Sequence, residues 1–185
     1  MPRFVLTYRA MKLSLNLKDD QYPFSGITEV RRVSRVIAFD SLGRIAIHTV
    51  SRDDAFGCQT YLETPGGGVD EGEDYQMAAI REAKEELGDE VQLLECLGDC
   101  VDAYNLIKRK NENRFFLARI KKEGLSKHFV SQGDLYIKET RLLTPKEIEE
   151  GYAAMPEQGV SLLVKRRELP FLRLAFSRLP HYLGK

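Results

Sequence analysis

The sequence has few cysteines, no long apolar run and no excess charge of either sign. Its three cysteines, Cys58, Cys96 and Cys100, are too few and too oddly spaced for a disulfide framework or a complete zinc site. Its apolar runs are far shorter than the roughly 20 residues that cross a bilayer, and residues 1–10 lack a signal-peptide pattern. Acidic and basic residues both number 28. We therefore expect a soluble, cytoplasmic protein with no membrane and no nucleic acid as partner.

Proline is also absent between Gly66 and Thr144, so the middle of the chain can form regular elements without interruption. A length of 185 residues with 43% hydrophobic residues suits one domain. Runs rich in β-formers predict strands at 34–40, 44–50, 59–63, 91–101, 113–120 and 136–143. Apolar spacing predicts helices at 75–87, 145–153 and 160–179, the last interrupted by Pro170. This order indicates an α/β sandwich with a mixed sheet.

The chain divides into three predicted parts. Residues 1–30 form an N-terminal extension, in which Phe4 to Leu17 suits a hairpin that either extends the sheet or contacts a second subunit of a homodimer. Residues 31–155 form the core domain. Residues 156–185 form a C-terminal helix that packs on this core.

Charge is balanced globally but not locally. Residues 63–90 contain ten acidic residues against two basic ones, a local net charge of −8. At about 100° per residue, the helix predicted at 75–87 places Glu82, Glu85 and Glu86 within an arc of roughly 100°. The opposite face carries the side chains expected to anchor this helix in the core, Met77, Ile80, Ala83 and Leu87.

These three glutamates repel one another, and Arg81 can relieve part of the repulsion by pairing with Glu85. A divalent cation would relieve it more fully, and carboxylate oxygens suit Mg²⁺ or Mn²⁺. Taken alone, such a helix is more often a solvated charged face. The glycine loop 66–68, just before the helix, favours a site, because glycines let the backbone approach a phosphate or turn a carbonyl toward a cation.

Loop and helix together resemble the Nudix box of the Nudix hydrolases, whose pattern is G-x5-E-x7-R-E-U-x-E-E-x-G-U, with U a bulky apolar residue. Every fixed letter is present between Gly67 and Asp89. Two softer positions depart from the pattern, because Ala83 is small and Asp89 is not apolar. A match of this length is far more specific than a lone glycine motif.

The resemblance implies an α/β/α sandwich and a metal-dependent hydrolysis of a nucleoside diphosphate linked to another group. Glu82, Glu85 and Glu86 correspond to the family's metal-binding and base carboxylates, and the Gly66 carbonyl to a further metal ligand. Glu73 and Arg81 correspond to a structural ion pair that ties the loop to the helix.

In some family members the general base comes from a later loop, and here the candidates are Glu139 and Asp134. A surface acid remains an equal alternative for both.

The substrate is less well defined by the sequence. The run Glu63 to Gly67 and the N-terminal extension resemble the branch that cleaves ADP-ribose and nucleotide sugars, whereas Tyr104 stands where ADP-ribose enzymes often have a proline. The alternatives are a nucleoside triphosphate or dinucleoside polyphosphate substrate, and a non-catalytic nucleotide sensor.

Basic residues cluster between Lys108 and Lys122, which suits either a loop that binds phosphate or a solvated hairpin edge. Tyr104, Phe115 and Phe116 are candidates for stacking on a base, although aromatic residues in strands are more often core.

Overall fold

The computed structural model describes residues 11–122 and 134–184. Within these residues, eight strands form one mixed sheet: β1 (Leu13–Leu17), β2 (Glu29–Phe39), β3 (Ile45–Asp54), β4 (Gly57–Glu63), β5 (Gly66–Gly68), β6 (Glu90–Tyr104), β7 (Arg109–Lys122) and β8 (Ile137–Leu143). The helices are α1 (Tyr75–Glu82), which continues into a π-helical turn at Ala83–Leu87, α2 (Pro145–Ala154) and α3 (Gly159–Leu183).

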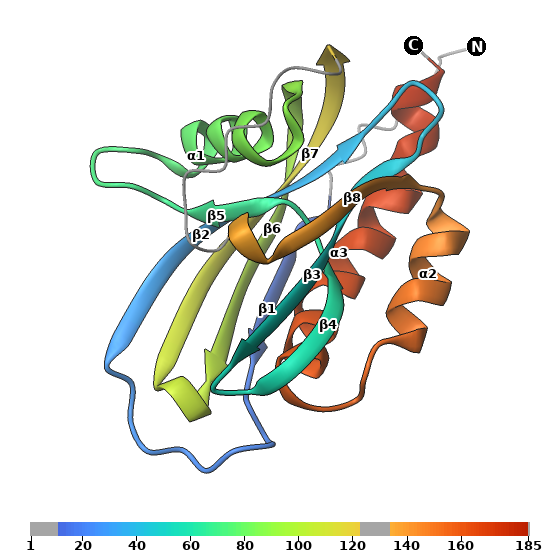
Figure 1. Cartoon of the computed structure of the whole chain (residues 1–185). Helices are drawn as coiled ribbons and strands as arrows, with labels where there is room; N and C mark the ends of the chain where they lie inside the picture. The colour runs from blue at the N-terminus through green and yellow to red at the C-terminus, as the bar shows by residue number, and fades with distance from the viewer. Residues whose placement is uncertain (1–10, 123–133, 185) are drawn as a thin grey trace, which may run out of the picture.

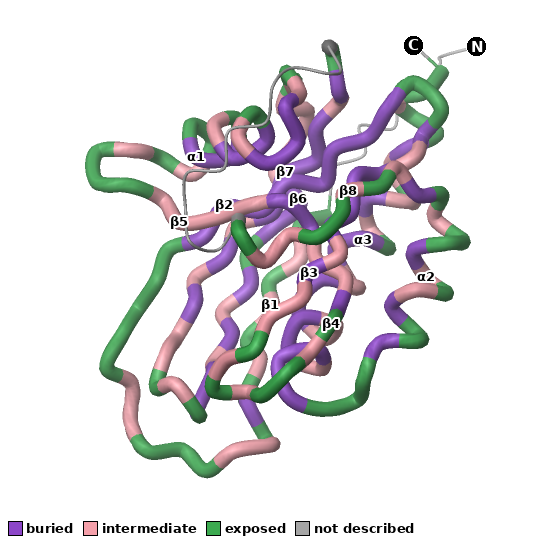
Figure 2. Tube along the Cα trace, in the orientation of Figure 1, coloured by how far each residue is buried: buried purple, intermediate pink, exposed green. Residues whose placement is uncertain are grey.

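The sheet lies between two helical layers, with α1 over one face and α2 and α3 over the other (Figure 1). Its strand order is β1-β6-β7-β2-β3-β4, while β5 pairs with β2 and β8 pairs with β3. Buried residues concentrate where β2 and β3 cross the centre of the molecule and on the inner sides of the helices (Figure 2). The predicted α/β/α sandwich with a mixed sheet is therefore confirmed.

The sheet opens between β2 and β3. The two strands leave a tight turn in which the Asp40 carboxylate accepts from the backbone N–H groups of Leu42 and Arg44. They then pair only at Phe39 and Ile45. Farther along, β2 pairs instead with β5, so the chain that enters β5 passes between the two diverging strands. This opening creates the space for the site described below.

Helix α1 begins and ends as predicted. The Asp74 side chain caps its N-terminus by accepting from the backbone of Gln76 and Met77 at 2.8 Å. Gly88 follows its last turn with a left-handed φ of 72°. The last turn, however, is π-helical rather than α-helical, which is a common irregularity at functional sites.

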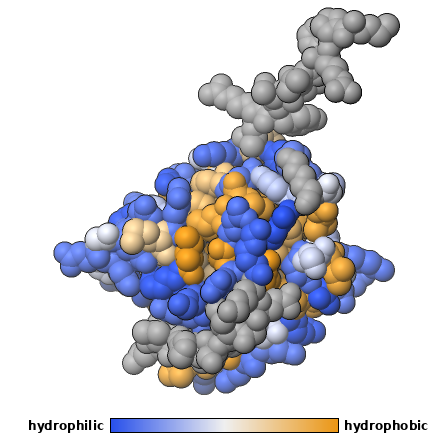
Figure 3. Space-filling view, turned by 90° about the horizontal axis from the view of Figure 1, so that it is seen from above, coloured by the Kyte–Doolittle hydropathy of each residue, from blue (hydrophilic) through white to orange (hydrophobic). Residues whose placement is uncertain are grey.

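The prediction of which face anchors α1 in the core is only half right. Ala83 and Leu87 are buried, but Met77 is 57% exposed and Ile80 is 48% exposed. The helix instead packs through small residues, chiefly Ala78 and Ala79, which let it lie close to the sheet. Seen from above, an apolar area interrupts a largely hydrophilic surface at this end of the molecule (Figure 3).

Helix α3 runs through Pro170 without interruption, contrary to the prediction. Buried side chains on both sides of the proline, including Leu163, Phe171 and Leu172, hold the helix on the sheet. Their packing outweighs the loss of one backbone hydrogen bond.

Except for Lys108, which lies in the preceding turn, the basic cluster between Lys108 and Lys122 lies on strand β7, which is not at an edge of the sheet. Its arginines have individual partners, since Arg114 pairs with Asp99 and Arg119 donates to the Tyr182 carbonyl. The edge-strand interpretation was therefore wrong, because β7 runs between β6 and β2.

Strand β1 pairs in parallel with β6 and extends the sheet. The first part of the predicted hairpin, residues 4–10, lies outside the described residues. No helix in the described ranges is long and apolar enough to cross a membrane.

Candidate active site

A cavity of about 290 Å³ lies at the opening between β2 and β3. It is bounded by the glycine loop, by the acidic end of α1 and by side chains from both strands. The residues that line it include Arg31, Arg35, His48, Arg52, Glu63, Gly66, Arg81, Glu82, Glu85 and Glu86. The sequence-predicted carboxylates and the glycine loop therefore face one space.

Glu86 is the most firmly held of the three carboxylates. It is buried, and its Oε2 accepts from the Gly66 backbone N–H at 2.8 Å. The same oxygen lies 3.2 Å from Nε2 of His48, whose Nδ1 lies 3.0 Å from Thr140 Oγ1. The start of β5, the end of α1 and strand β3 thus meet at one oxygen atom.

Gly66 is required at this point by its backbone. Its φ is +142°, and an added Cβ would overlap the backbone carbonyl of Ser34. The preceding carbonyl, that of Pro65, accepts from the Val36 N–H at 2.9 Å. Strand β2 therefore fixes the backbone beside Glu86, and any side chain at this position would push the loop away from the strand.

Glu82 and Glu85 share one counter-ion. Arg81 Nη1 donates to Glu82 Oε1 at 2.8 Å and to Glu85 Oε2 at 3.1 Å. Burial, and next the charge of Glu86, raise the pKa of Glu82 to about 7. A cation in the cavity would offset both causes, because its positive charge stabilises the ionised form of Glu82.

Arg81 also ties the loop to the helix. Its guanidinium makes a two-point pair with Glu73, at 3.0 and 2.9 Å, and donates to the Gly68 carbonyl at 2.8 Å. These charge-assisted bonds raise the pKa of Arg81, first through the hydrogen bond to Glu73. This arrangement is suited to holding the glycine loop in a fixed orientation relative to α1.

The donor set fits a hard divalent cation. In the described ranges, no three His, Cys, Asp or Glu side chains are already gathered closely enough to hold a metal ion. However, Glu82 and Glu86 face the same cavity with oxygen donors, and Gly67 leaves room for Glu82, because an added Cβ there would overlap Glu82 Oε1. Arg81 donates hydrogen bonds to carboxylate oxygen atoms that a cation would bind, so cation binding requires Arg81 to give up some of these hydrogen bonds.

Glu139, predicted as an alternative base, lies away from this cavity. It is exposed on β8 and pairs with Arg141 at 3.3 Å. In the β3–β8 ladder Thr49 faces Glu139, whereas His48 faces Thr140, so Glu139 lies on the opposite side of the sheet from His48. An irregularity in this ladder, which brings Ile137 to the cavity, could not be seen in the sequence. The side chain of Asp134 lies outside the described residues.

Two of the three aromatic candidates for base stacking belong to the core. Phe115 is fully buried and stacks on Phe171, with ring centroids 4.0 Å apart, and Phe116 is 3% exposed. Tyr104 is also buried, but it lines a second cavity beside the first.

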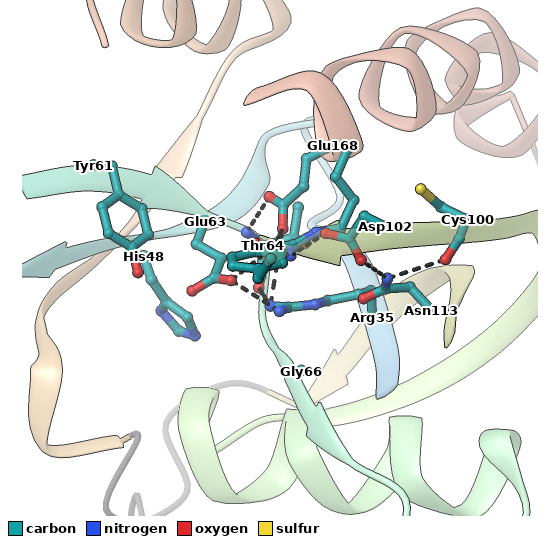
Figure 4. A network of polar contacts seen from close by, with 12 residues as sticks. Arg35, His48, Tyr61, Glu63, Thr64, Gly66, Cys100, Asp102, Asn113 and Glu168 are labelled. Carbon is teal, nitrogen blue, oxygen red and sulfur yellow. Dashed lines mark hydrogen bonds and ion pairs between the residues drawn. The ribbon is translucent and has the colours of Figure 1, made fainter. Parts of the chain in front are cut away.

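A buried polar network lies directly behind the glycine loop (Figure 4). Glu168 of α3 is fully buried, and its Oε2 accepts from the Thr64 backbone N–H and from the Tyr152 hydroxyl, both at 2.7 Å. Because Thr64 lies two residues before Gly66, α3 restrains the same loop that Glu86 holds from the other side.

Two arginines balance the acids of this network. Arg167 contacts Glu63 at 2.8 Å, Glu168 at 2.9 Å and Asp102 at 3.3 Å. Arg35 contacts Glu63 at 2.8 Å. Burial opposes the ionisation of Glu63, but the two arginines outweigh it and hold its pKa below the usual value. Each charge of the network therefore has a partner, and Asp102, Arg167 and Glu168 are almost fully buried.

Sequence reasoning missed His48, Arg31, Arg35 and Arg52. Each lies on a strand that reaches the box only through the folded sheet. His48 carried one signal, since it is a polar residue at a buried position within the apolar run Ile45 to Val50. The arginines of β2 and β3 carried none that separates them from surface charges.

The comparisons with known proteins agree with this geometry. A family model described as a NUDIX domain matches residues 30–166. A comparison with curated proteins gives no match. An acidic helix and a glycine loop beside a cavity, within this domain, define a hydrolase that acts on phosphoric anhydride bonds. The chain belongs to the Nudix family.

Solved structures share the fold at low sequence identity. A NUDIX hydrolase from Nitrosomonas europaea is 13% identical, with a TM-score of 0.62 over 80% of this chain and 90% of that one. A MutT protein from Methanosarcina mazei Go1 is 13% identical, with a TM-score of 0.54 over 84% and 98%. An ADP-ribose pyrophosphatase from Streptococcus suis 89-1591 is 13% identical, with a TM-score of 0.50 over 80% and 90%.

Proposed function

We propose that this chain is a Mg²⁺- or Mn²⁺-dependent pyrophosphohydrolase, with ADP-ribose or a nucleotide sugar as its favoured substrate. One observation carries the proposal: Glu82 and Glu86 face the same cavity, where burial and the charge of Glu86 raise the pKa of Glu82. An uncompensated acidic cavity would repel a diphosphate, whereas a cavity loaded with divalent cations would attract it. When bound, the cation neutralises phosphoryl oxygens and lowers the pKa of water.

The residues of the chain supply orientation and proton transfer. One carboxylate, that of Glu82 or Glu86, accepts the proton of the attacking water as the new phosphorus–oxygen bond forms, and the bridging phosphorus–oxygen bond breaks with its electron pair on the departing phosphate. Gly66 and His48 hold Glu86 in place through its Oε2. Arg81 and Glu73 keep the glycine loop against α1. Glu85 completes the acidic set at the mouth of the cavity and shares Arg81 with Glu82.

Two arginines lining the cavity support a diphosphate substrate. Arg31 on β2 and Arg52 on β3 line the same cavity as the glutamates. A substrate that spans from the acidic side to these arginines would place its phosphates between opposite charges. The protein chemistry suits a nucleoside diphosphate derivative, and the solved relatives include both an ADP-ribose pyrophosphatase and a MutT protein.

A substrate panel tests the proposal. ADP-ribose, nucleotide sugars, dinucleoside polyphosphates and nucleoside triphosphates are incubated with Mg²⁺ or Mn²⁺, and the products are identified. The favoured class releases a nucleoside monophosphate and a sugar phosphate, whereas a triphosphate substrate releases a monophosphate and pyrophosphate. Release of pyrophosphate alone would overturn the substrate assignment.

The variant E86Q separates an enzyme from a non-catalytic sensor. We expect E86Q to lose turnover by at least about a hundredfold while its circular dichroism and thermal transition remain those of a folded protein. The matched control is E150Q, an exposed α2 glutamate that pairs with Lys146 at 3.8 Å. Unchanged turnover in E86Q would remove the assigned role, and absence of turnover in the wild type would favour a sensor.

A further inference from the structure

His48 connects three elements that lie far apart in the sequence. It is on β3, directly opposite Thr140 in the β3–β8 ladder, so both side chains are on the same face of the sheet. Its side chain is 3% exposed and reaches Glu86, in the turn that ends α1, at 3.2 Å. Each ring nitrogen therefore has one partner, and the position of the ring proton decides which partner donates.

The hydrogen bonds at Glu86 assign that proton. Oε2 of Glu86 already accepts from the Gly66 backbone N–H at 2.8 Å. An ionised carboxylate can only accept, so Nε2 of His48 is the donor in the contact with Glu86. In a neutral imidazole the other nitrogen, Nδ1, is then an acceptor, and the hydroxyl of Thr140 at 3.0 Å donates to it.

These bonds make the two oxygens of Glu86 different. A carboxylate oxygen offers two lone-pair positions, and the donors of Gly66 and His48 fill both positions at Oε2. From the residues that the structure describes, Oε1 accepts no hydrogen bond. A cation can therefore bind Oε1 without displacing a donor, whereas at Glu82 Oε1 it has to displace Arg81.

The place of His48 favours a role in the site over a role in the core alone. Its ring lines the cavity that contains the box glutamates. The hydroxyl, the imidazole and the carboxylate form one chain of hydrogen bonds that ends at a candidate cation ligand. Such chains orient ligating side chains in metal sites, and their loss typically costs about ten- to a hundredfold in metal affinity or activity.

We propose that His48 is a positioning residue, which holds Oε2 of Glu86 so that Oε1 faces the cation, and that Thr140 fixes the tautomer in which His48 donates. This inference rests on the proposed function. His48 acts through Glu86 and transfers no proton in the reaction, because its Nε2–H is engaged by the carboxylate.

The tautomer is tested in the metal-free protein by NMR with ¹⁵N-labelled histidine, in EDTA and slightly alkaline buffer, where an imidazole is ordinarily neutral. The chain has three histidines, so the signals lost in H48Q assign His48. We expect a proton on Nε2, none on Nδ1, and a shift of the Nδ1 resonance in T140V. A proton on Nδ1 and none on Nε2 would overturn the proposal.

Loss of the donor tests the consequence for the site. We expect H48L to weaken Mn²⁺ binding about tenfold or more and to lower kcat by a similar factor at saturating Mg²⁺, with KM changed less than about threefold. H48Q carries an amide N–H that can replace Nε2–H, so it should recover most of both losses. T140V should lower kcat about three- to tenfold, and T140S should recover it.

Matched controls are H181Q, at an exposed histidine near the end of α3, and T60V, which removes an exposed hydroxyl that donates to Ser51 on the neighbouring strand. Equal losses in H48L and H48Q would show that the ring and not its donor matters, and would overturn the proposal. A change confined to KM would assign His48 to substrate contact and also overturn it. If H48L fails to fold, equal kcat in T140V and T140S overturns it instead.

Mn²⁺ binding separates this inference from the hydrolase proposal, because it needs no substrate. If the wild type turns over no substrate, but H48L weakens Mn²⁺ binding and H48Q recovers it, the hydrolase proposal fails and the positioning role stands. If turnover is present and is lost in E86Q, but H48L keeps wild-type kcat and Mn²⁺ affinity, the positioning role fails alone.

Discussion

Two clusters of acidic and basic side chains lie on either side of the glycine loop, and they differ in how their charges are balanced. Behind the loop, Glu63, Asp102 and Glu168 pair with Arg35 and Arg167, and Asp102, Arg167 and Glu168 are almost fully buried. In front of it, Glu82 and Glu85 share Arg81 and, together with Glu86, line the cavity. Similar residue types therefore build a structural ion-pair network behind the loop and a cluster with oxygen donors suited to a cation in front of it.

The two clusters have similar residue types. What separates the structural role from the functional one is how fully each charge is paired and whether the side chains face a cavity. Burial of an ion pair contributes to stability only when each charge keeps a partner. Arg167 meets this condition with three carboxylates, whereas Glu82 must share its partner Arg81 with Glu85, and its pKa is raised by burial and by the charge of Glu86. We therefore expect substitutions in the rear network to change stability and substitutions in the front cluster to change function.

The largest expected effect is on Arg167. The variant R167M leaves Glu63, Asp102 and Glu168 without their shared partner, so the free energy of unfolding should fall by about 3–5 kcal/mol. Urea denaturation measures this change. The matched control is R173M, because Arg173 pairs with Glu149 on the exposed surface, where a pair contributes less than about 1 kcal/mol. Equal losses in the two variants would contradict the division between the clusters.

The next effect concerns the pH dependence of stability at Glu82. Its pKa rises from 4.5 in the unfolded chain to about 7 in the folded protein, so the folded state binds the proton more tightly. The stabilisation is complete below pH 4.5 and is lost as the pH rises through 7. Without divalent cations, the wild type should lose up to about 3 kcal/mol relative to E82Q over this range.

Thermal unfolding at several pH values in EDTA measures the difference between the wild type and E82Q. Adding Mg²⁺ should restore the stability of the wild type above pH 7 and leave E82Q nearly unchanged. A difference between the two proteins that stays constant from pH 4.5 to pH 8 would show that the proton is not bound at Glu82.

A smaller effect is expected at Gly67. The added methyl group of G67A would displace the end of the Glu82 side chain, which is flexible, so the free energy of unfolding should change by less than about 1 kcal/mol. Turnover should nevertheless fall between about tenfold and a hundredfold, because a small misplacement of a catalytic group is costly. A G67A enzyme with wild-type kcat would show that the position of Glu82 is unimportant.

The elements and residues encoded locally were predictable from the sequence. The box glutamates, the Asp74 cap and Gly88, which ends α1, lie within about 25 residues of one another. Their spacing along one helix therefore determines where they lie relative to each other. Helix α2 likewise begins at the predicted Pro145, supported by a capping box between Thr144 and Glu147.

The rest depends on contacts that a single sequence does not display. His48 reaches Glu86 across 38 positions of the chain, and Arg31 meets Asn111 across 80, because the order of strands brings them together. The π-helical turn and the exposed Met77 depend on how α1 packs against the sheet, and the placement of Glu139 depends on how β8 pairs with β3. Periodicity assumes regular elements and so misses each of these.

The most direct test of the account is a titration of the protein with Mn²⁺, followed by electron paramagnetic resonance of the free ion. We predict saturable binding by the wild type, weakened at least about tenfold in both E82Q and E86Q. The control E149Q, on the exposed surface of α2, should bind as the wild type does. Equal Mn²⁺ binding by the wild type, E82Q and E86Q would contradict the claim that this pair of glutamates holds the cation.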